Sequence, residues 1–331
     1  NFNFKNASIL ALIIVSVVLF VVSCRMTAEG IESVNGDVEI PELKEFLQLG
    51  STTFELAFSE IVELSDIAIL KEDKVITFES IDIEDTFENV QSEETQINIC
   101  KKRIVLETES KLDIGQEYSL YGVATDLNGN SLSFNIPFYG FNSNVAGLVL
   151  SEVRADMSKT KVEFVELFVY KSGNVGGMIL YNAADDGKGE YVFPAAEVNK
   201  GEYIVVHFRK LEEQAIGCID ETSDNLNLSV AEDSCADARD FWLDGSEARI
   251  GKSDVILLRE RMGGNLMDCV VYAEESLASW KNEIFVNAVA EAVDCGVWYG
   301  GVDVTDAASS TGITNTRTLS RQNIGQIVTA V

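Results

Sequence analysis

Short apolar stretches separated by polar turns fill the second half of the chain. Residues 148–153 (LVLSEV) and 162–167 (VEFVEL) flank a polar segment at 156–161, a pattern that predicts two neighbouring β-strands joined by a turn. The later stretches lack helical periodicity, and several stand beside glycine or asparagine turns. These stretches are 175–180, 191–194, 202–208, 253–258 and 266–272. The series predicts one antiparallel β-sandwich over residues 143–331.

Residues 41–142 contain a separate series of short strands. Residues 54–58 (FELAF) begin with an alternation of apolar and polar positions, and Asn128-Gly129 is a hairpin signal because both residues accept a positive φ. Strands and turns at this spacing predict a first antiparallel sandwich. The strand that ends in Phe58-Ser59 and the hairpin within 112–130 resemble a bacterial Ig-like domain of the surface-layer type. That resemblance implies a spacer domain.

The second series resembles the lamin-tail domain, an Ig-like β-sandwich of nuclear lamins and of many exported bacterial proteins. The matching pieces, in chain order, are 150–153, 163–167, 177–180, 191–194, 200–206, 251–258, 268–272 and 318–321. The resemblance implies an interaction module. Two insertions, at 209–248 and 273–300, depart from the family pattern, so they leave the rim of the sandwich and any ligand surface there undefined.

The second insertion is predicted to contain a helix at 274–293. Glu274 and Glu275 stand at its start, where the helix dipole favours acidic side chains. We expect its apolar stripe to pack on the sandwich, and a stripe that binds a partner is the alternative. The apolar positions near helical spacing are Leu277, Trp280, Ile284, Val289 and Val293.

The N-terminal residues have the layout of a secretory signal. Lys5 precedes an apolar run at 7–23, and a small residue precedes Cys24. Residues 21–24 (VVSC) resemble a bacterial lipobox, although Val21 stands where leucine is most common. The resemblance implies that Cys24 carries lipid such as palmitate. We therefore predict a signal peptide at 1–23, a lipidated tether at 24–40, and export to the bacterial outer membrane or cell surface. A retained membrane helix is the alternative, because the run is near the lower length limit for a bilayer span.

The charge of the chain disfavours one class of partner. The formal net charge is −29 and the pI is about 4.3, so the surface repels the phosphates of nucleic acids. Such a surface attracts cations or basic protein patches, although solubility alone is the simpler explanation. We expect a membrane contact through the lipid anchor and an unknown protein or glycan ligand.

Four cysteines of the second domain bracket or occupy the insertions. An exported chain meets oxidising conditions, so Cys218–Cys235 and Cys269–Cys295 are our predicted disulfides. The cysteines have no Cys-x-x-Cys spacing, which argues against zinc. Cys100 is left over and is expected to be a buried thiol.

Aromatic residues of the second domain are candidates for a recognition patch. They are Trp242, Trp280, Trp298 and Tyr299. Aromatic side chains combine a large apolar surface with a polar handle, which suits binding surfaces as well as cores. Packing within the insertions is the alternative.

The sequence gives no coherent catalytic set. Glu163 and Glu166 are three positions apart on one strand and point to opposite faces, so they and Glu152 are expected to be structural or exposed to solvent. His207, the single histidine, is expected on the surface or half-buried, and no nucleophile is evident beside it. The spacing of Asp126, Asn128 and Asn130 imitates the start of a calcium loop and more simply caps a turn. We predict no catalytic residue, no metal and no cofactor.

Together these observations predict an all-β protein with two Ig-like antiparallel β-sandwiches in tandem, the second with a helical insertion. The expected function is that of a lipid-anchored surface protein that presents a lamin-tail-like binding module and is not an enzyme. Two alternatives remain at this point. One is a cation-dependent hydrolase that uses Asp and Glu residues, and the other is a self-associating structural protein of the cell envelope.

Overall fold

The structure is a computed structural model that describes residues 39–324 apart from 73, 93–94, 159–160, 186–188, 212–214 and 248; between 84 and 102 it describes the backbone alone. The predicted signal peptide, Cys24 and nearly all of the tether lie outside the described residues. In the described part of the chain, no helix has both the length and the apolar character needed to cross a membrane.

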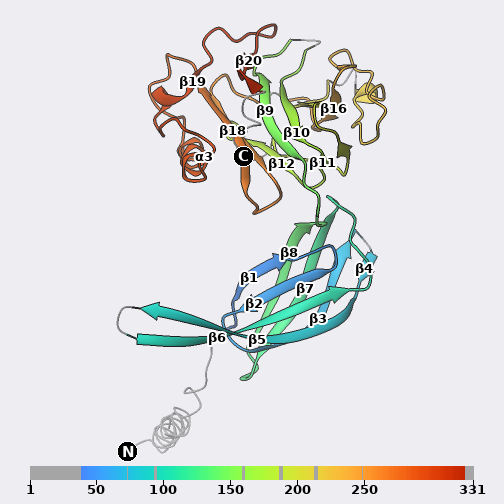
Figure 1. Cartoon of the computed structure of the whole chain (residues 1–331), viewed down its shortest axis with the longest axis vertical. Coiled ribbons are helices and arrows are strands. Elements are labelled where there is room, and N and C mark those ends of the chain that lie inside the picture. Colours follow the sequence, from blue (N-terminus) through green and yellow to red (C-terminus); the bar gives the residue numbers. More distant parts are fainter. Residues whose placement is uncertain are drawn as a thin grey trace, which may run out of the picture.

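The described chain is all-β with one α-helix, and its strands form two sandwiches that follow each other along the chain (Figure 1), which confirms the predicted fold class. The first sandwich has two four-stranded sheets with the orders β1-β2-β6-β5 and β4-β3-β7-β8. Every pair of neighbouring strands in these sheets is antiparallel. The strands are β1 (Leu43–Gln48), β2 (Thr53–Phe58), β3 (Val62–Lys71), β4 (Lys74–Ile76), β5 (Phe78–Ser92), β6 (Thr95–Thr108), β7 (Glu117–Asp126) and β8 (Ser131–Tyr139).

The core of the first sandwich follows from alternation along its strands. In β7 every second residue is buried, so that one face, including Tyr118 and Leu120, lies inside and the other faces outwards. Phe54 packs against Phe138 across the two sheets, with ring centroids 5.3 Å apart. The long hairpin of β5 and β6 extends beyond the sandwich (Figure 1). Strand β6 runs without a break through the apolar stretches at 97–99 and 104–106.

The second sandwich has two five-stranded sheets and a small two-stranded one. The sheet orders are β16-β15-β10-β9-β20, β13-β12-β17-β18-β19 and β11-β14. The pairs β15–β16 and β18–β19 are parallel, and the others are antiparallel. The strands are β9 (Gly147–Arg154), β10 (Phe164–Lys171), β11 (Gly173–Asn174), β12 (Ile179–Asn182), β13 (Tyr191–Val192), β14 (Glu197–Val198), β15 (Tyr203–His207), β16 (Arg239–Trp242), β17 (Asp254–Arg259), β18 (Leu266–Ala273), β19 (Ala308–Ser309) and β20 (Leu319–Ser320). Short 3₁₀ turns are η1 (Ala215–Gly217) and η2 (Val304–Asp306).

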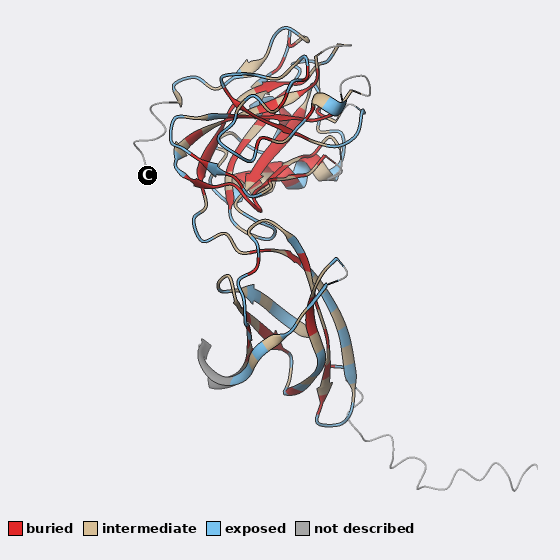
Figure 2. Ribbon diagram, turned by 90° about the vertical axis from the view of Figure 1, so that its right-hand side faces the viewer, coloured by how far each residue is buried: buried red, intermediate tan, exposed pale blue. Residues whose placement is uncertain are grey.

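The core of the second sandwich is the larger of the two and includes Leu167, Val206 and Ile256, each fully buried. Buried residues are concentrated in this part of the molecule (Figure 2). A second cluster lies on the outer face of β17 and β18, where Phe285 and Val289 of the helix pack against the sheet. Burying that face drives the helix onto the sandwich, as predicted.

The helix is shorter than the sequence suggested. Helix α3 (Glu283–Asp294) begins nine residues after the predicted start at Glu274. Asn282 caps it, because its side-chain oxygen accepts hydrogen bonds from the backbone N–H groups of Ile284 and Phe285. The acidic pair at 274–275 therefore lies outside the helix, and the capping asparagine was the stronger start signal.

The two sandwiches meet at a close backbone contact. Gly115, with φ of +67°, lies so near Gly177 that a Cβ atom on it would be 2.7 Å from the Gly177 nitrogen. Asn142 in the connecting segment donates from its side chain to the carbonyl oxygens of Asn174 (2.7 Å) and Gly176 (3.1 Å). Only glycine permits this approach, so the junction has a defined contact.

Candidate functional site

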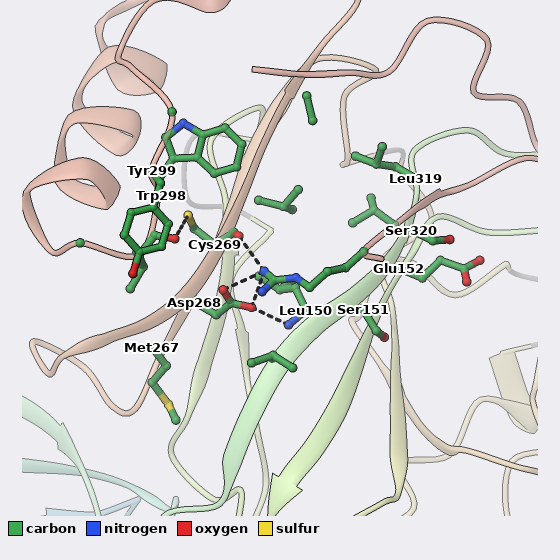
Figure 3. Close-up of a pocket in the computed structure, with 18 of the residues that line it drawn as sticks. Leu150, Ser151, Glu152, Met267, Asp268, Cys269, Trp298, Tyr299, Leu319 and Ser320 are labelled. Atoms are coloured by element: carbon green, nitrogen blue, oxygen red, sulfur yellow. Dashed lines mark hydrogen bonds and ion pairs between the residues drawn. The ribbon is translucent and has the colours of Figure 1, made fainter. Parts of the chain in front are cut away.

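A cavity of about 870 Å³ opens on the second sandwich between strands β9 and β18. We call it the seam groove. Residues Val149–Val153 and Met267–Val270 form its walls, and Trp298 and Tyr299 lie at one end (Figure 3). Leu319 and Ser320 of β20 lie at the other end with Glu152. The groove thus lies where the edges of two different sheets face each other.

Both strands that border the groove have largely uncovered edges. Strand β20 pairs with β9 only opposite Val153 and Glu152. Strand β19 pairs with β18 only opposite Tyr272 and Ala273. Within the described residues, no other strand covers the rest of either edge. The rest of the β9 edge is packed inside the protein, because Leu148 and Leu150 are 0% and 2% exposed.

An ion pair links the two edges inside the groove. The Leu150 N–H of β9 donates to Asp268 Oδ2 of β18 at 2.7 Å. Arg321 Nη2 lies 2.8 Å from both oxygens of Asp268 and 3.3 Å from the carbonyl oxygen of Cys269. The backbone N–H of Arg321 donates to the Ser151 carbonyl at 2.7 Å. We call the Asp268–Arg321 pair the clasp (Figure 3 shows its bonds).

Burial controls the ionisation of the groups beside the clasp. Burial raises the pKa of Asp268, and the positive charge of Arg321 opposes that rise. Burial also raises the pKa of Cys269 to about 12, so its sulfur is a thiol at neutral pH. That thiol lies 3.6 Å from the Val297 carbonyl oxygen. The positive charge of Arg321 therefore offsets the cost of burying the Asp268 carboxylate, and the Cys269 thiol is unreactive.

Two carboxylates stand directly opposite each other at the far end of the groove. Glu152 of β9 and Glu166 of β10 are register partners. Ser151 donates to Glu166 at 2.6 Å, while burial and the charge of Glu152 raise the pKa of Glu166. Like charges directly opposite in a sheet are destabilising. This end of the groove is therefore an acidic position that a cation would stabilise.

Comparison with known proteins places the domain that carries the groove. Residues 146–330 match the family model TP_1001_2nd, described as a protein second domain, and this span is more than half of the chain. The chain belongs to the TP_1001_2nd family. Every residue that lines the seam groove lies inside the matched span. We refer to residues 146–330 as the TP_1001_2nd domain.

The chain is also similar to a relative from a spirochaete and, more weakly, to a solved structure. A protein of Treponema pallidum (strain Nichols), named "Uncharacterized protein", is 35% identical over 198 residues, which are 57% of this chain and 49% of the relative. The chain thus spans about half the length of that relative. The N-terminal part of the bacterial S-layer protein SbsC matches 50% of this chain and 40% of its own chain at 13% identity, with a TM-score of 0.23. That score is too low to bear on the fold.

The four aromatic candidates of the TP_1001_2nd domain do not form one patch. Trp298 and Tyr299 lie together at the groove, and Tyr299 is 95% exposed. Trp242 is 3% exposed and stacks on His207, with ring centroids 3.8 Å apart. Trp280 stacks on Phe285, and its indole N–H donates to the Val302 carbonyl. Two candidates therefore lie at the seam groove, and two pack against other side chains.

His207 is fully buried, which corrects the expectation of a surface or half-buried position. The first insertion folds over its strand, and β16 pairs with β15 in parallel so that Trp242 stands opposite His207. His207 Nε2 donates to Asp240 Oδ1 at 2.8 Å, and Nδ1 has no hydrogen-bond partner within the described residues. Burial lowers the pKa of His207. The sequence could not show this because the covering strand comes from an insertion more than thirty residues away.

Glu163 lies apart from the other two glutamates considered from the sequence, as expected for positions that point to opposite faces. Glu163 is buried and pairs with Arg209 at 2.6 Å, whereas Glu152 and Glu166 lie by the seam groove. Nowhere in the described part do three or more His, Cys, Asp or Glu side chains form a group able to hold a metal ion. Asp126 accepts hydrogen bonds from the backbone N–H groups of Asn128 and Asn130. Asp126 therefore caps a turn, which was the simpler explanation of this calcium-loop-like spacing.

The structure contains neither predicted disulfide. Cys218 and Cys269 are buried thiols, and Cys235 and Cys295 are exposed thiols. Cys269 lies inside the cluster beneath α3, whereas Cys295 is the C-cap residue of that helix. Cys24 lies outside the described residues, as does the side chain of Cys100.

The sequence analysis missed the residues that join the groove. Asp268 and Arg321 were each part of the pieces compared with the lamin tail, but they are far apart in the chain and neither was considered as a site residue. An acidic residue in an otherwise apolar strand was the available signal.

Proposed function

We propose that the chain is a lipid-anchored, exported surface protein whose TP_1001_2nd domain is a binding module of the lamin-tail type. The acyl chains on Cys24 hold the protein at the bacterial outer membrane or cell surface. The tether and the first, Ig-like sandwich set the distance from the membrane, and the second sandwich makes the contact. No chemical step is part of this proposal.

The observation that carries the proposal is the seam groove with its aromatic end. Its volume of about 870 Å³ lies within the range of ligand-binding sites in proteins. Apolar walls from Val149 and Val270, with a few polar groups between them, are the usual composition of such sites. Tyr299 is 95% exposed beside this groove, and an exposed aromatic ring next to a cavity is typical of a contact residue.

The ionisation of the groove residues favours binding over catalysis. Asp268 is neutralised by Arg321 and hydrogen-bonded to the backbone, so it is poorly suited to take a proton from a substrate. Cys269, with a pKa of about 12, is a poor nucleophile at neutral pH. These two groups therefore give no support to the hydrolase alternative.

The test is a binding array. The full chain is applied to immobilised extracellular matrix proteins and glycans, together with two variants. Tyr299→Ala removes the exposed ring at the groove, and Tyr203→Ala removes a partly exposed ring on β15, outside the groove lining. We expect the full chain and Tyr203→Ala to bind the same spots, with Tyr299→Ala at least about fivefold weaker. Equal binding by all three would refute the role of the groove.

A further inference from the structure

We propose that the first sandwich pairs with a second copy of this chain, edge to edge, through strand β8. The contact would lie at residues 131–135, where β8 of one copy would run antiparallel to β8 of the other. The seam groove lies in the second sandwich, so this inference does not depend on the proposed function. The first sandwich would then be a site of self-association and not a spacer alone.

The outer edge of β8 is free and accessible. In the sheet β4-β3-β7-β8, strand β8 is the last strand, and within the described chain it pairs with β7 alone. Ser131, Ser133 and Asn135 are exposed at this edge. A strand from another molecule can therefore reach the backbone of β8.

Hydrogen bonds at both ends of the β7–β8 pair show which backbone groups of β8 point outwards. The Asp126 N–H donates to the Asn130 carbonyl at 2.9 Å, and the Gly140 N–H donates to the Gln116 carbonyl at 2.9 Å. Bonded pairs alternate along an antiparallel ladder, so the even positions of β8 bond to β7 and the odd positions point away from it. Pro137, which has no N–H to donate, occupies one of the odd positions, where a sheet tolerates proline. The three odd positions of β8 before Pro137 therefore present N–H and C=O groups to a further strand.

Strand β8 differs from the other edge strands of the first sandwich because it carries no charge. Proteins usually protect sheet edges from pairing by charged side chains or by keeping the edge strand very short. Strand β1 carries Lys44 and Glu45, β4 is three residues long and begins with Lys74, and β5 includes Glu79. Residues 131–139 (SLSFNIPFY) have no charged side chain, although 24% of the chain is charged. The β8 edge therefore lacks the protection that the other edges have.

The sequence of this edge is complementary to itself. A two-fold axis at Ser133 would place Ser133 opposite its own copy and Ser131 opposite Asn135, and these are the positions with outward backbone groups. Their small polar side chains can form hydrogen bonds across the pair. Leu132 would stand opposite Phe134, and both are half-buried side chains of the first core. A second copy would therefore cover apolar surface as well as backbone groups.

The charge of the whole chain favours an uncharged contact between copies. Two molecules with a formal net charge of −29 repel each other at long range, so a contact between them must avoid opposing carboxylates. The β8 edge meets that requirement. Salt screens the repulsion, and we expect it to strengthen the pairing, whereas it would weaken the binding of a basic partner.

Analytical ultracentrifugation of the full chain tests the pairing, in a mild detergent that covers the N-terminal apolar run of every variant alike. Residues 131–135 span roughly 16 Å, so the contact is smaller than the roughly 1,200 Å² of a standard stable interface. We therefore expect a monomer–dimer equilibrium with a dissociation constant on the order of 0.1 mM, which shifts towards dimer as salt is added. A chain that stays monomeric up to about 1 mM overturns the proposal.

Matched lysine variants locate the contact. Ser133→Lys places two like charges against each other at the two-fold axis, and we expect the dimer to weaken at least about tenfold. Ser65→Lys makes the same change at an exposed serine of β3 in the same sheet and should leave the dimer unchanged. Equal association of the two variants would contradict a contact at β8.

Mixing two charge variants tests the register. Ser133→Lys and Ser133→Glu should each associate weakly when alone, because each opposes its own charge in the second copy. A mixture of the two should associate at least as well as the wild type, because opposite charges then meet at the axis. If the mixture associates no better than either variant alone, the strands do not meet at Ser133 and the proposed pairing is wrong.

Amide hydrogen exchange separates backbone pairing from a contact made by side chains alone. The N–H groups of Ser131, Ser133 and Asn135 should exchange more slowly as the protein concentration rises, because they become bonded in the dimer. The Leu132 N–H, which points to β7, should be protected at every concentration. A dimer that forms without added protection at the three outward positions would show that the copies meet elsewhere.

Discussion

The two edges of the sheet β16-β15-β10-β9-β20 are completed in different ways. At the β16 edge, the first insertion adds a strand and covers His207 with Trp242, and Arg209 at the start of that insertion forms a buried ion pair with Glu163 beside β10. At the β9 edge, β20 pairs at only two positions and a cavity remains. One edge is closed by buried polar contacts that are costly to break, and the other is held by a partly exposed clasp. The difference indicates that the first edge maintains the fold, and it supports our proposal that the groove at the second edge binds a ligand.

The sharpest test of the closed edge is the buried ion pair. Glu163 is 1% exposed and accepts from Arg209 Nε at 2.6 Å. Glu163→Ala would leave the buried guanidinium without its counter-charge, and we expect the free energy of unfolding to fall by about 3–5 kcal/mol. Urea denaturation followed by circular dichroism measures this loss. Glu166→Gln is the control, because Glu166 faces the other side of β10 and its pKa is already raised by burial. A loss below about 1 kcal/mol for Glu163→Ala would show that the closed edge is not held by this pair.

Acid should affect the two edges in opposite directions. Burial and the charge of Arg154 lower the pKa of His207, against the opposing effect of Asp240 and Glu221, so the folded state binds this proton less readily than the unfolded state. Its contribution to stability is therefore present above the ordinary value of 6.5 and is lost as the pH falls below it. At the open edge, burial raises the pKa of Glu166 and Asp268, so the folded state takes up those protons more readily and these groups favour folding as the pH falls.

The contribution of His207 to this pH dependence is measured by unfolding the wild type and His207→Gln at several pH values between 7 and 5. The free energies of unfolding of the two proteins are then compared. We expect the wild type to lose more stability than the variant over this range, with a difference of at most about 1.4 kcal/mol per pH unit for one proton. Parallel curves for the two proteins would mean that His207 titrates alike in the folded and unfolded states.

The sequence predicted the classes of element better than their partners. The apolar patterns at 54–58 and 162–167 identified β2 and β10, because alternate positions along most of each strand lie in a core and that signal is local. The helix begins later than predicted because Asn282 caps it, whereas the acidic residues at 274–275 only resemble a helix start. A helix cap is a single hydrogen-bonding residue, and several polar residues before α3 are able to act as one, so the sequence alone does not fix where the helix begins.

The site was only partly predictable for a different reason. Trp298 and Tyr299 were proposed from their chemistry, and the structure places both at the groove. The clasp was missed because Asp268 and Arg321 are 53 positions apart, and only the folding of β18 and β20 brings them together. His207 was placed wrongly because β16, which covers it, belongs to an insertion. Contacts between distant segments depend on topology, which periodicity does not encode.

The clasp offers the finest test of the open edge. Arg321→Ala removes the guanidinium that bridges Asp268 and the Cys269 carbonyl, but the side chain is 27% exposed and water can replace part of its contacts. We expect a loss of about 1 kcal/mol in unfolding free energy, well below that of Glu163→Ala. Amide hydrogen exchange provides the local measurement, because the Leu150 N–H bonded to Asp268 should exchange faster in the variant while the Val206 N–H in β15 is unaffected. If Arg321→Ala instead unfolded the domain as strongly as Glu163→Ala, the clasp would maintain the fold as the buried pair does, and the two edges would not differ.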